Sequence, residues 1–291
     1  MTSADFARNR DNFCYRHPDR QSFVLCQRCL RTICGECQTP AAVGVICPEC
    51  LAEQRRAQSP AQRQAQRRWR SGPSAVATGA APVMTYVLVG ITAAVYLLQL
   101  LIPGRIVEGA LGLFPPLLYP DWSGQFQPWR LLTDAFVHTS FWHIALNLLS
   151  LWLIGRILEP LIGRWRMLTL YLVSAFGASV AVAVLAPGTF VMGASGAVFG
   201  LFGALLVIGR HLGAEITGIL VVLAVNLVIG FIPSLGISWQ AHVGGLVAGL
   251  LMALILIGSR SPDRRPRMIG LTVALCAGLA LLLLLPPLLY G

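Results

Sequence analysis

The stretch that decides the fold is residues 193–209, GASGAVFGLFGALLVIG, which is apolar except for Ser195 near its start. Two further apolar segments also begin with polar residues, HIALN at 143–147 and AHVGGLVAG at 241–249. Polar groups inside a membrane are costly and usually functional. Counted as membrane helices, these segments are the second, fourth and sixth. Even-numbered helices run in one direction, so a single membrane face receives all the polar groups.

The composition predicts a membrane protein. Of 291 residues, 56% are hydrophobic and 12% charged, about half the charged share of a soluble domain. We expect seven transmembrane helices, the fourth being short at about 24 Å. The apolar segments lie near residues 83–102, 136–155, 168–186, 195–209, 215–233, 240–258 and 269–289. The predicted fold class is an all-α polytopic membrane protein.

The distribution of arginines predicts the orientation, since all 22 basic residues are arginines. Twelve precede the first apolar segment and eight more fall in alternate loops, whereas only Arg105 and Arg130 lie on the other side. Basic residues favour the cytoplasm, which predicts a cell-membrane protein with a cytoplasmic N-terminus and an extracytoplasmic C-terminus. The chain begins polar, so we expect no signal peptide. Topology explains the net charge of +10, and no nucleic-acid partner is expected.

Four regions are predicted along the chain. Residues 1–52 form a cysteine-rich module and 53–80 a basic, flexible linker rich in Arg, Gln, Ala and Ser. Residues 81–258 form a six-helix core. Residues 259–291 form a cytoplasmic loop and a seventh transmembrane helix.

The N-terminal module carries a metal-ligand pattern. Its eight candidate ligands are four closely spaced pairs: Cys14 and His17, Cys26 and Cys29, Cys34 and Cys37, Cys47 and Cys50. This set suffices for two tetrahedral zinc ions in closed, structural sites, and metal binding would supply folding energy that so small a core lacks. Disulfides are the alternative, but they require an oxidising compartment, and the predicted topology places the module in the cytosol. Cys276 lies alone in the last apolar segment and is expected to serve packing.

The spacing of these pairs resembles a B-box-type zinc finger. That resemblance implies an interleaved arrangement, with one ion held by Cys14, His17, Cys34 and Cys37 and the other by Cys26, Cys29, Cys47 and Cys50. The last pair is usually histidine in that family, and here it is Cys47 and Cys50.

The membrane segments carry a candidate nucleophile and base. Ser195 is predicted in the first turn of a helix, where free backbone N–H groups can stabilise an oxyanion. A serine hydroxyl needs a base, and His242 is available near the same face. Small residues spaced along both helices would let them approach closely. No acidic residue lies near His242 in the chain, so we interpret the pair as a dyad, with Asp121 and Asp134 as less favoured third members.

His143 and Asn147 are candidate oxyanion donors. At spacing i, i+4 they share one face of the second helix, near the same membrane surface. Both side chains can donate hydrogen bonds to a developing oxyanion. Structural hydrogen bonds between helices are the alternative for each residue.

The chain carries an ordered set of motifs: Trp129-Arg130, His138, His143-x3-Asn147, Glu159-x3-Gly163 in a cytoplasmic loop, Gly193-Ala-Ser195-Gly196 and His242-x2-Gly245-x3-Gly249. With these motifs, the chain resembles the rhomboid family of intramembrane serine proteases over about residues 83–258. The resemblance implies that Ser195 is the nucleophile, His242 the general base, and His143 and Asn147 the oxyanion donors. It places Phe199 where an aromatic ring packs on the catalytic histidine, and the seventh helix resembles the variant with one extra C-terminal span.

The sequence thus favours an intramembrane serine endopeptidase that needs no cofactor for catalysis. Expected partners are the lipid bilayer, membrane proteins with a helix-weakened transmembrane segment, and a cytosolic protein bound by the zinc module. A non-catalytic rhomboid-like protein that binds membrane clients, or a transporter, is the alternative. Residues 193–197 lack the second glycine of a G-x-S-x-G elbow, which disfavours an α/β-hydrolase.

Overall fold

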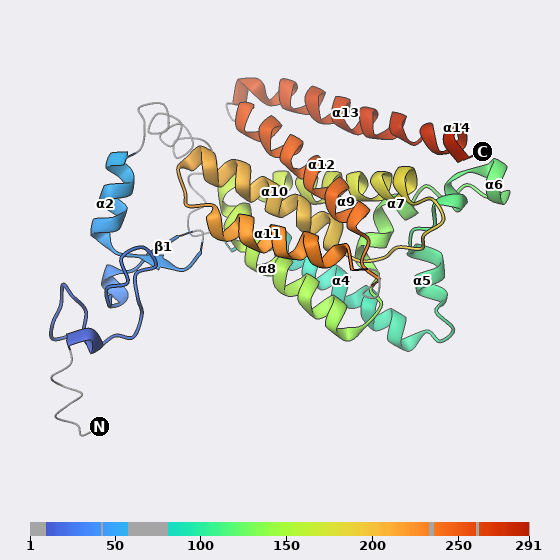
Figure 1. Ribbon diagram of the computed structural model, residues 1–291. Coiled ribbons are helices and arrows are strands. Elements are labelled where there is room, and N and C mark those ends of the chain that lie inside the picture. Colours follow the sequence, from blue (N-terminus) through green and yellow to red (C-terminus); the bar gives the residue numbers. More distant parts are fainter. Residues whose placement is uncertain (1–9, 42, 58–80, 233–235, 260–261, 291) are drawn as a thin grey trace. The chain divides into compact units, whose positions relative to one another are not determined.

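A computed structural model describes residues 10–41, 43–57, 81–232, 236–259 and 262–290 (Figure 1). The described residues fall into two compact units. One contains residues 10–57 with 209–218, and the other contains the remaining membrane-type helices.

The N-terminal unit has little regular structure. Its core consists of Ile33 and six buried cysteines, so the cysteines occupy the space that large apolar side chains fill in an ordinary domain. Helix α2 crosses the predicted domain boundary at residue 52, and residues 58–80 of the predicted linker lie outside the described residues. The elements are η1 (Arg10–Asn12), η2 (Gly35–Cys37), the antiparallel strands β1 (Thr39–Pro40) and β2 (Val45–Ile46), and α2 (Pro48–Ala57).

The second unit is a bundle of apolar helices. Six helical segments are long and apolar enough to span a membrane. They are α4 (Val83–Leu101), α8 (Phe141–Ile162), α9 (Arg164–Leu185), α10 (Ser195–Leu212), α12 (Trp239–Gly258) and the segment of α13 (Arg265–Leu282) with α14 (Leu285–Tyr290). The apolar helix α11 (Thr217–Gly230) is shorter, with 14 residues. The predicted all-α polytopic fold is confirmed.

The short helix differs from the predicted one. We expected the fourth segment to be short, but α10 has 18 residues because its helix continues through Arg210 beyond the apolar run. The fifth segment, α11, spans only about 21 Å. It also packs loosely, because of its residues only Ile219, Leu223 and Gly230 are buried.

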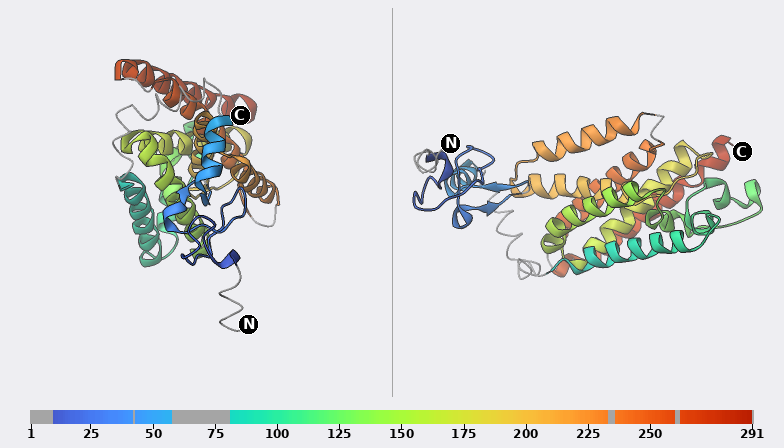
Figure 2. Two further views of the ribbon diagram at one scale, coloured as in Figure 1. Left: turned by 90° about the vertical axis from the view of Figure 1, so that its left-hand side faces the viewer. Right: turned by 90° about the horizontal axis from the view of Figure 1, so that it is seen from below.

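Helices α9 and α12 form the centre of the bundle. A methyl group added at Gly244 of α12 would overlap the side chain of Ala181 and the backbone of Gly177, so these helices touch almost backbone to backbone. Helix α13 packs against α9 and α12 on the outside of the bundle (Figure 2). Small residues at the contacts allow this close packing in a membrane, where helix association depends on van der Waals contact.

The segment between α4 and α8 folds around Arg130. Its buried guanidinium donates to the carbonyl oxygens of Gly109 (2.6 Å) and Gly112 and to Oε1 of Gln127 (2.6 Å), which ties three parts of the segment together. The short elements here are α5 (Ile106–Leu111), η4 (Pro115–Leu118), α6 (Pro120–Ser123), α7 (Arg130–Thr133) and η5 (Asp134–Phe136).

The placement of Glu159 corrects a prediction. We expected it in a loop, but it lies in the last turns of α8, and its carboxylate accepts hydrogen bonds from the N–H groups of Met84 and Thr85 at 2.8 and 2.7 Å. The Thr85 hydroxyl donates to the same carboxylate. The first N–H groups of a helix have no partner within it, so Glu159 satisfies the N-terminal donors of α4.

Candidate active site and metal centres

Ser195 and His242 meet across the contact between α10 and α12. The Ser195 Oγ lies 3.0 Å from Nε2 of His242, which is hydrogen-bonding distance. Ser195 is the first residue of α10 and is partly exposed, whereas His242 is buried in the first turns of α12. The two residues are 47 positions apart, and the structure brings them together.

Glycines create this approach. A Cβ atom at Gly245 would overlap the backbone of Gly196, and one at Gly249 would overlap the backbone of Gly200. The predicted small-residue contact between the two helices is therefore present. Its position one and two turns beyond the Ser195–His242 pair sets the distance between the two functional side chains.

This contact gives a first testable prediction. Gly249→Ala should force α10 and α12 apart, destabilise the protein by about 1–3 kcal/mol and lower any Ser195-dependent cleavage by roughly 100-fold, because small displacements of reacting groups are costly. Gly258→Ala is the matched control, since nothing lies within 4 Å of a Cβ at that position of the same helix. Thermal unfolding and cleavage assays in detergent would measure both effects. Wild-type rates in Gly249→Ala would contradict the importance of the contact.

Phe199 fixes the plane of the His242 ring. The two rings are stacked with centroids 4.0 Å apart and planes inclined by 12°. Phe199 lies one turn after Ser195 on α10, so the same helix presents the hydroxyl and holds the imidazole.

No acidic side chain among the described residues contacts His242. Its Nδ1 is buried without a hydrogen-bond partner in this part of the chain. Asp134 instead accepts a hydrogen bond from the Ser179 hydroxyl at 3.2 Å. Burial raises the pKa of Asp134 to about 8. Asp121 lies in α6. Among the described residues, neither carboxylate is hydrogen-bonded to His242.

His143 faces the turn that precedes Ser195. Gly193 has a φ of +130°, and a Cβ there would lie 2.7 Å from the His143 ring, so only glycine fits. Asn147 is buried one turn further along α8, and its Nδ2 donates to the His143 carbonyl at 2.8 Å.

Two supporting residues around His143 were not identified from the sequence. The Thr139 hydroxyl lies 3.0 Å from Nδ1 of His143, which orients the ring. Gln99 of α4 exchanges hydrogen bonds with the backbone of His138 at 2.8 and 3.0 Å. The sequence did hold a signal for Thr139. It directly precedes Ser140, a typical N-cap residue that begins α8, so it lies beside the first turn of the helix that carries His143.

His138 supports the turn before Ser195. Its ring packs against His143 with centroids 4.9 Å apart, and its Nε2 accepts a hydrogen bond from the Ala194 N–H at 3.4 Å. Burial, and to a smaller extent the nearby His143, lowers the pKa of His138 to about 3. The ring is therefore neutral near pH 7, as an acceptor must be.

In the N-terminal unit, the eight predicted ligands form two clusters. One contains Cys14, His17, Cys34 and Cys37, and the other contains Cys26, Cys29, Cys47 and Cys50, with the ligand atoms of each within 4.8 Å of one another. This grouping is the one that the B-box resemblance implies. Each cluster could bind one metal ion.

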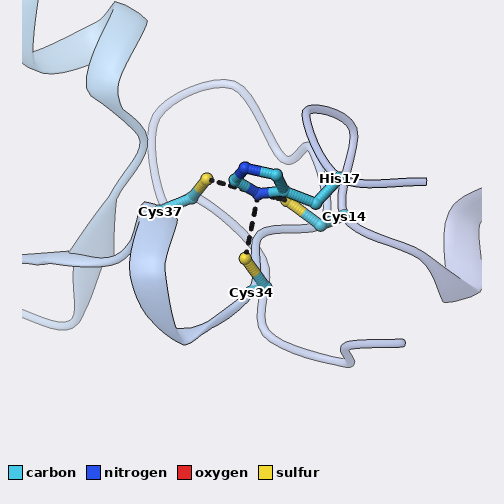
Figure 3. Close-up of side chains that lie close together, drawn as sticks. All are labelled: Cys14, His17, Cys34 and Cys37. Atoms are coloured by element: carbon cyan, nitrogen blue, oxygen red, sulfur yellow. Dashed lines mark hydrogen bonds between the residues drawn. The ribbon is translucent and has the colours of Figure 1, made fainter. Parts of the chain in front are cut away.

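The distances in the first cluster fit a tetrahedral ion (Figure 3). Nδ1 of His17 lies 3.8, 3.3 and 3.4 Å from the sulfur atoms of Cys14, Cys34 and Cys37. One ring nitrogen carries at most one proton and cannot bond to three sulfurs at once. A central zinc ion would place sulfur and nitrogen about 3.5 Å apart, given its usual bond lengths.

The second cluster fits in the same way. The sulfur atoms of Cys29 and Cys47 are 3.7 Å apart, near the edge of about 3.8 Å expected for a ZnS4 tetrahedron and far from the S–S bond of about 2.05 Å in a disulfide. Nε of Arg31 donates to the Cys29 sulfur at 3.3 Å, and the Cys47 N–H donates to the Cys26 sulfur at 3.2 Å. Such donors stabilise thiolate ligands.

Comparison with known proteins identifies the bundle. Residues 125–259 match the Rhomboid domain family. The chain is 35% identical over 135 residues to the Bacillus subtilis rhomboid YdcA, a match that covers 44% of this chain and 67% of that protein. The chain belongs to the rhomboid family.

Two longer rhomboid relatives match over a similar length of this chain. Rhomboid protease GluP of Bacillus subtilis is 38% identical over 136 residues, which are 44% of this chain and 26% of that protein. RHOMBOID-like protein 4 of Arabidopsis thaliana is 36% identical over 136 residues, 44% of this chain and 34% of that protein. The match thus spans about a quarter to a third of these relatives. It supports a rhomboid-type intramembrane protease or rhomboid-like protein, with multiple membrane spans.

Proposed function

We propose that this rhomboid is an intramembrane serine endopeptidase that cleaves membrane proteins near the extracytoplasmic face. The single observation that carries the proposal is the 3.0 Å contact between Ser195 Oγ and His242 Nε2. A serine hydroxyl is a weak nucleophile, and an adjacent imidazole is the group that activates it.

In the proposed mechanism, Nε2 of His242 takes the hydroxyl proton as Ser195 Oγ attacks the substrate carbonyl carbon. The resulting oxyanion accepts hydrogen bonds from the Ser195 N–H, His143 and the Asn147 amide. His242 then gives the proton to the leaving nitrogen, so the peptide bond breaks and an acyl-enzyme forms. Water, deprotonated by His242, hydrolyses the ester and restores Ser195.

Phe199 orients the His242 ring, as the acidic side chain does in a Ser-His-Asp triad. With no acidic partner at Nδ1 in the described residues, stacking on Phe199 is what holds the His242 ring in plane. The arrangement keeps charge out of the apolar interior, where an unpaired carboxylate would be costly.

The oxyanion donors should have graded effects. We expect His143→Ala and Asn147→Ala each to lower the cleavage rate about 10- to 1000-fold, the range for loss of one such donor, while KM changes little. Leu146→Ala on the same helix is the control, because Leu146 is 62% exposed. If His143→Ala and Asn147→Ala cleave as fast as the Leu146→Ala control, the two side chains form structural hydrogen bonds and do not stabilise the oxyanion.

The proposed substrates are transmembrane proteins with a helix-weakened segment. A helical peptide bond is sterically closed and its carbonyl is already hydrogen-bonded, so the segment must unwind before Ser195 reaches it. Replacing glycine or proline near the cut with leucine should therefore slow cleavage at least 10-fold, as measured with a panel of model substrates. Leucine replacements at the far end of the same span are the control, and an equal slowing there would argue against local unwinding.

For the N-terminal module we propose two structural zinc ions, each with four protein ligands. Closed sites of this kind stabilise a fold and do not activate water. We place the module in the cytoplasm, on the side away from Ser195, according to the arginine distribution. Its proposed role is to recruit a cytosolic protein or the cytoplasmic tail of a substrate.

A further inference from the structure

A crevice outside the Ser195–His242 pair opens between α9, α12 and α13. Its volume is about 210 Å³. Its walls are formed mainly by Thr169, Met252, Leu256, Ile269, Thr272 and Val273. The Thr169 hydroxyl donates to the carbonyl of Trp165 at 3.0 Å. The Thr272 hydroxyl lies 2.8 Å from the carbonyl of Met268 and 3.6 Å from the sulfur of Met252, so both hydroxyls have partners within the protein. The walls therefore offer an apolar surface.

Arg166 lines the same crevice. It lies near the start of α9. Arg265, the first residue of α13, shares one helix face with Met268 and Ile269, three and four residues later, and both of these line the crevice. In the part of the chain that the structure describes, neither arginine forms an ion pair with an acidic side chain. Two basic residues at the starts of α9 and α13 thus belong to the helix faces that border an apolar crevice.

We propose that this crevice binds an anionic phospholipid. The headgroup phosphate bridges Arg166 and Arg265, and an acyl chain lies along the walls between α9, α12 and α13. Basic pockets between membrane helices favour anionic headgroups, and guanidinium groups bind phosphate oxygens through paired hydrogen bonds. The apolar walls identify the occupant as a lipid, since a free phosphate would gain nothing from them.

The test uses the full chain purified in detergent and titrated with phosphatidylglycerol or phosphatidylcholine, with bound lipid counted by native mass spectrometry. We expect one phosphatidylglycerol to be retained in preference to phosphatidylcholine. The double variant Arg166→Gln, Arg265→Gln should weaken it roughly 10- to 100-fold, as expected for two basic contacts. Arg156→Gln with Arg210→Gln removes the same charge from the same membrane face and should retain it.

A second variant separates a lipid from a free anion. Val273→Trp fills the crevice without changing charge, and it should also weaken phosphatidylglycerol binding at least 10-fold. Equal retention of the two lipids, equal loss in both arginine pairs, or unchanged binding in Val273→Trp would each overturn the proposal. Thermal unfolding of every variant confirms that the bundle is intact.

Discussion

Ser195→Ala is expected to abolish cleavage of a model transmembrane substrate, and His242→Ala should do nearly the same. The two groups act as a unit through their 3.0 Å contact, so losing either costs about as much as losing both. In a soluble serine protease the loss is on the order of 10⁶-fold, and we expect the rate here to fall below detection.

Labelling provides an independent measurement of the dyad. A fluorophosphonate should modify Ser195 in the wild-type chain and fail to react in both variants. Ser150→Ala removes a hydroxyl from a different helix, α8, and should leave labelling and cleavage unchanged. Cleavage that persists in Ser195→Ala would rule out the protease, and labelling without cleavage in the wild-type chain would favour a client-binding protein.

Removing metal should unfold the N-terminal module while leaving the bundle folded. The module's core is made of cysteines with Ile33, so the two proposed zinc ions would supply its folding energy, on the order of 10–16 kcal/mol for each structural zinc. Elemental analysis of the full chain should find two zinc ions. After chelation, limited proteolysis should cut within residues 10–57 at least 100-fold faster.

Single substitutions make the zinc test specific. Cys47→Ser should cost one ion of the two, whereas Cys276→Ser, the lone cysteine of α13, should cost none. The chelated enzyme should still cleave a model substrate in detergent, because the proposed ions are structural. Metal content that is unchanged in Cys47→Ser would contradict the assignment of the second site.

The sequence predicts those features that depend on local spacing. Gly245 and Gly249, one helical turn apart, predict the contact that brings His242 to Ser195, and the pairs of ligands predict two metal clusters. Features that depend on distant partners were not predictable. The position of Glu159 depends on the N–H groups of Met84 and Thr85, more than 70 residues earlier. The length of α11 could not be predicted either, because hydropathy shows where apolar residues lie and not where the helix ends.

The hydrogen bonds of Glu159 impose an order on biosynthesis. The N–H groups of Met84 and Thr85 emerge from the ribosome 75 and 74 residues before their acceptor. At about 5–20 residues per second, the first span waits roughly 4 to 15 s for the residue that completes it. During that interval, the start of α4 has to remain among water or lipid headgroups that can accept from its backbone. The contact between α4 and α8 can therefore be completed only after Glu159 has been made.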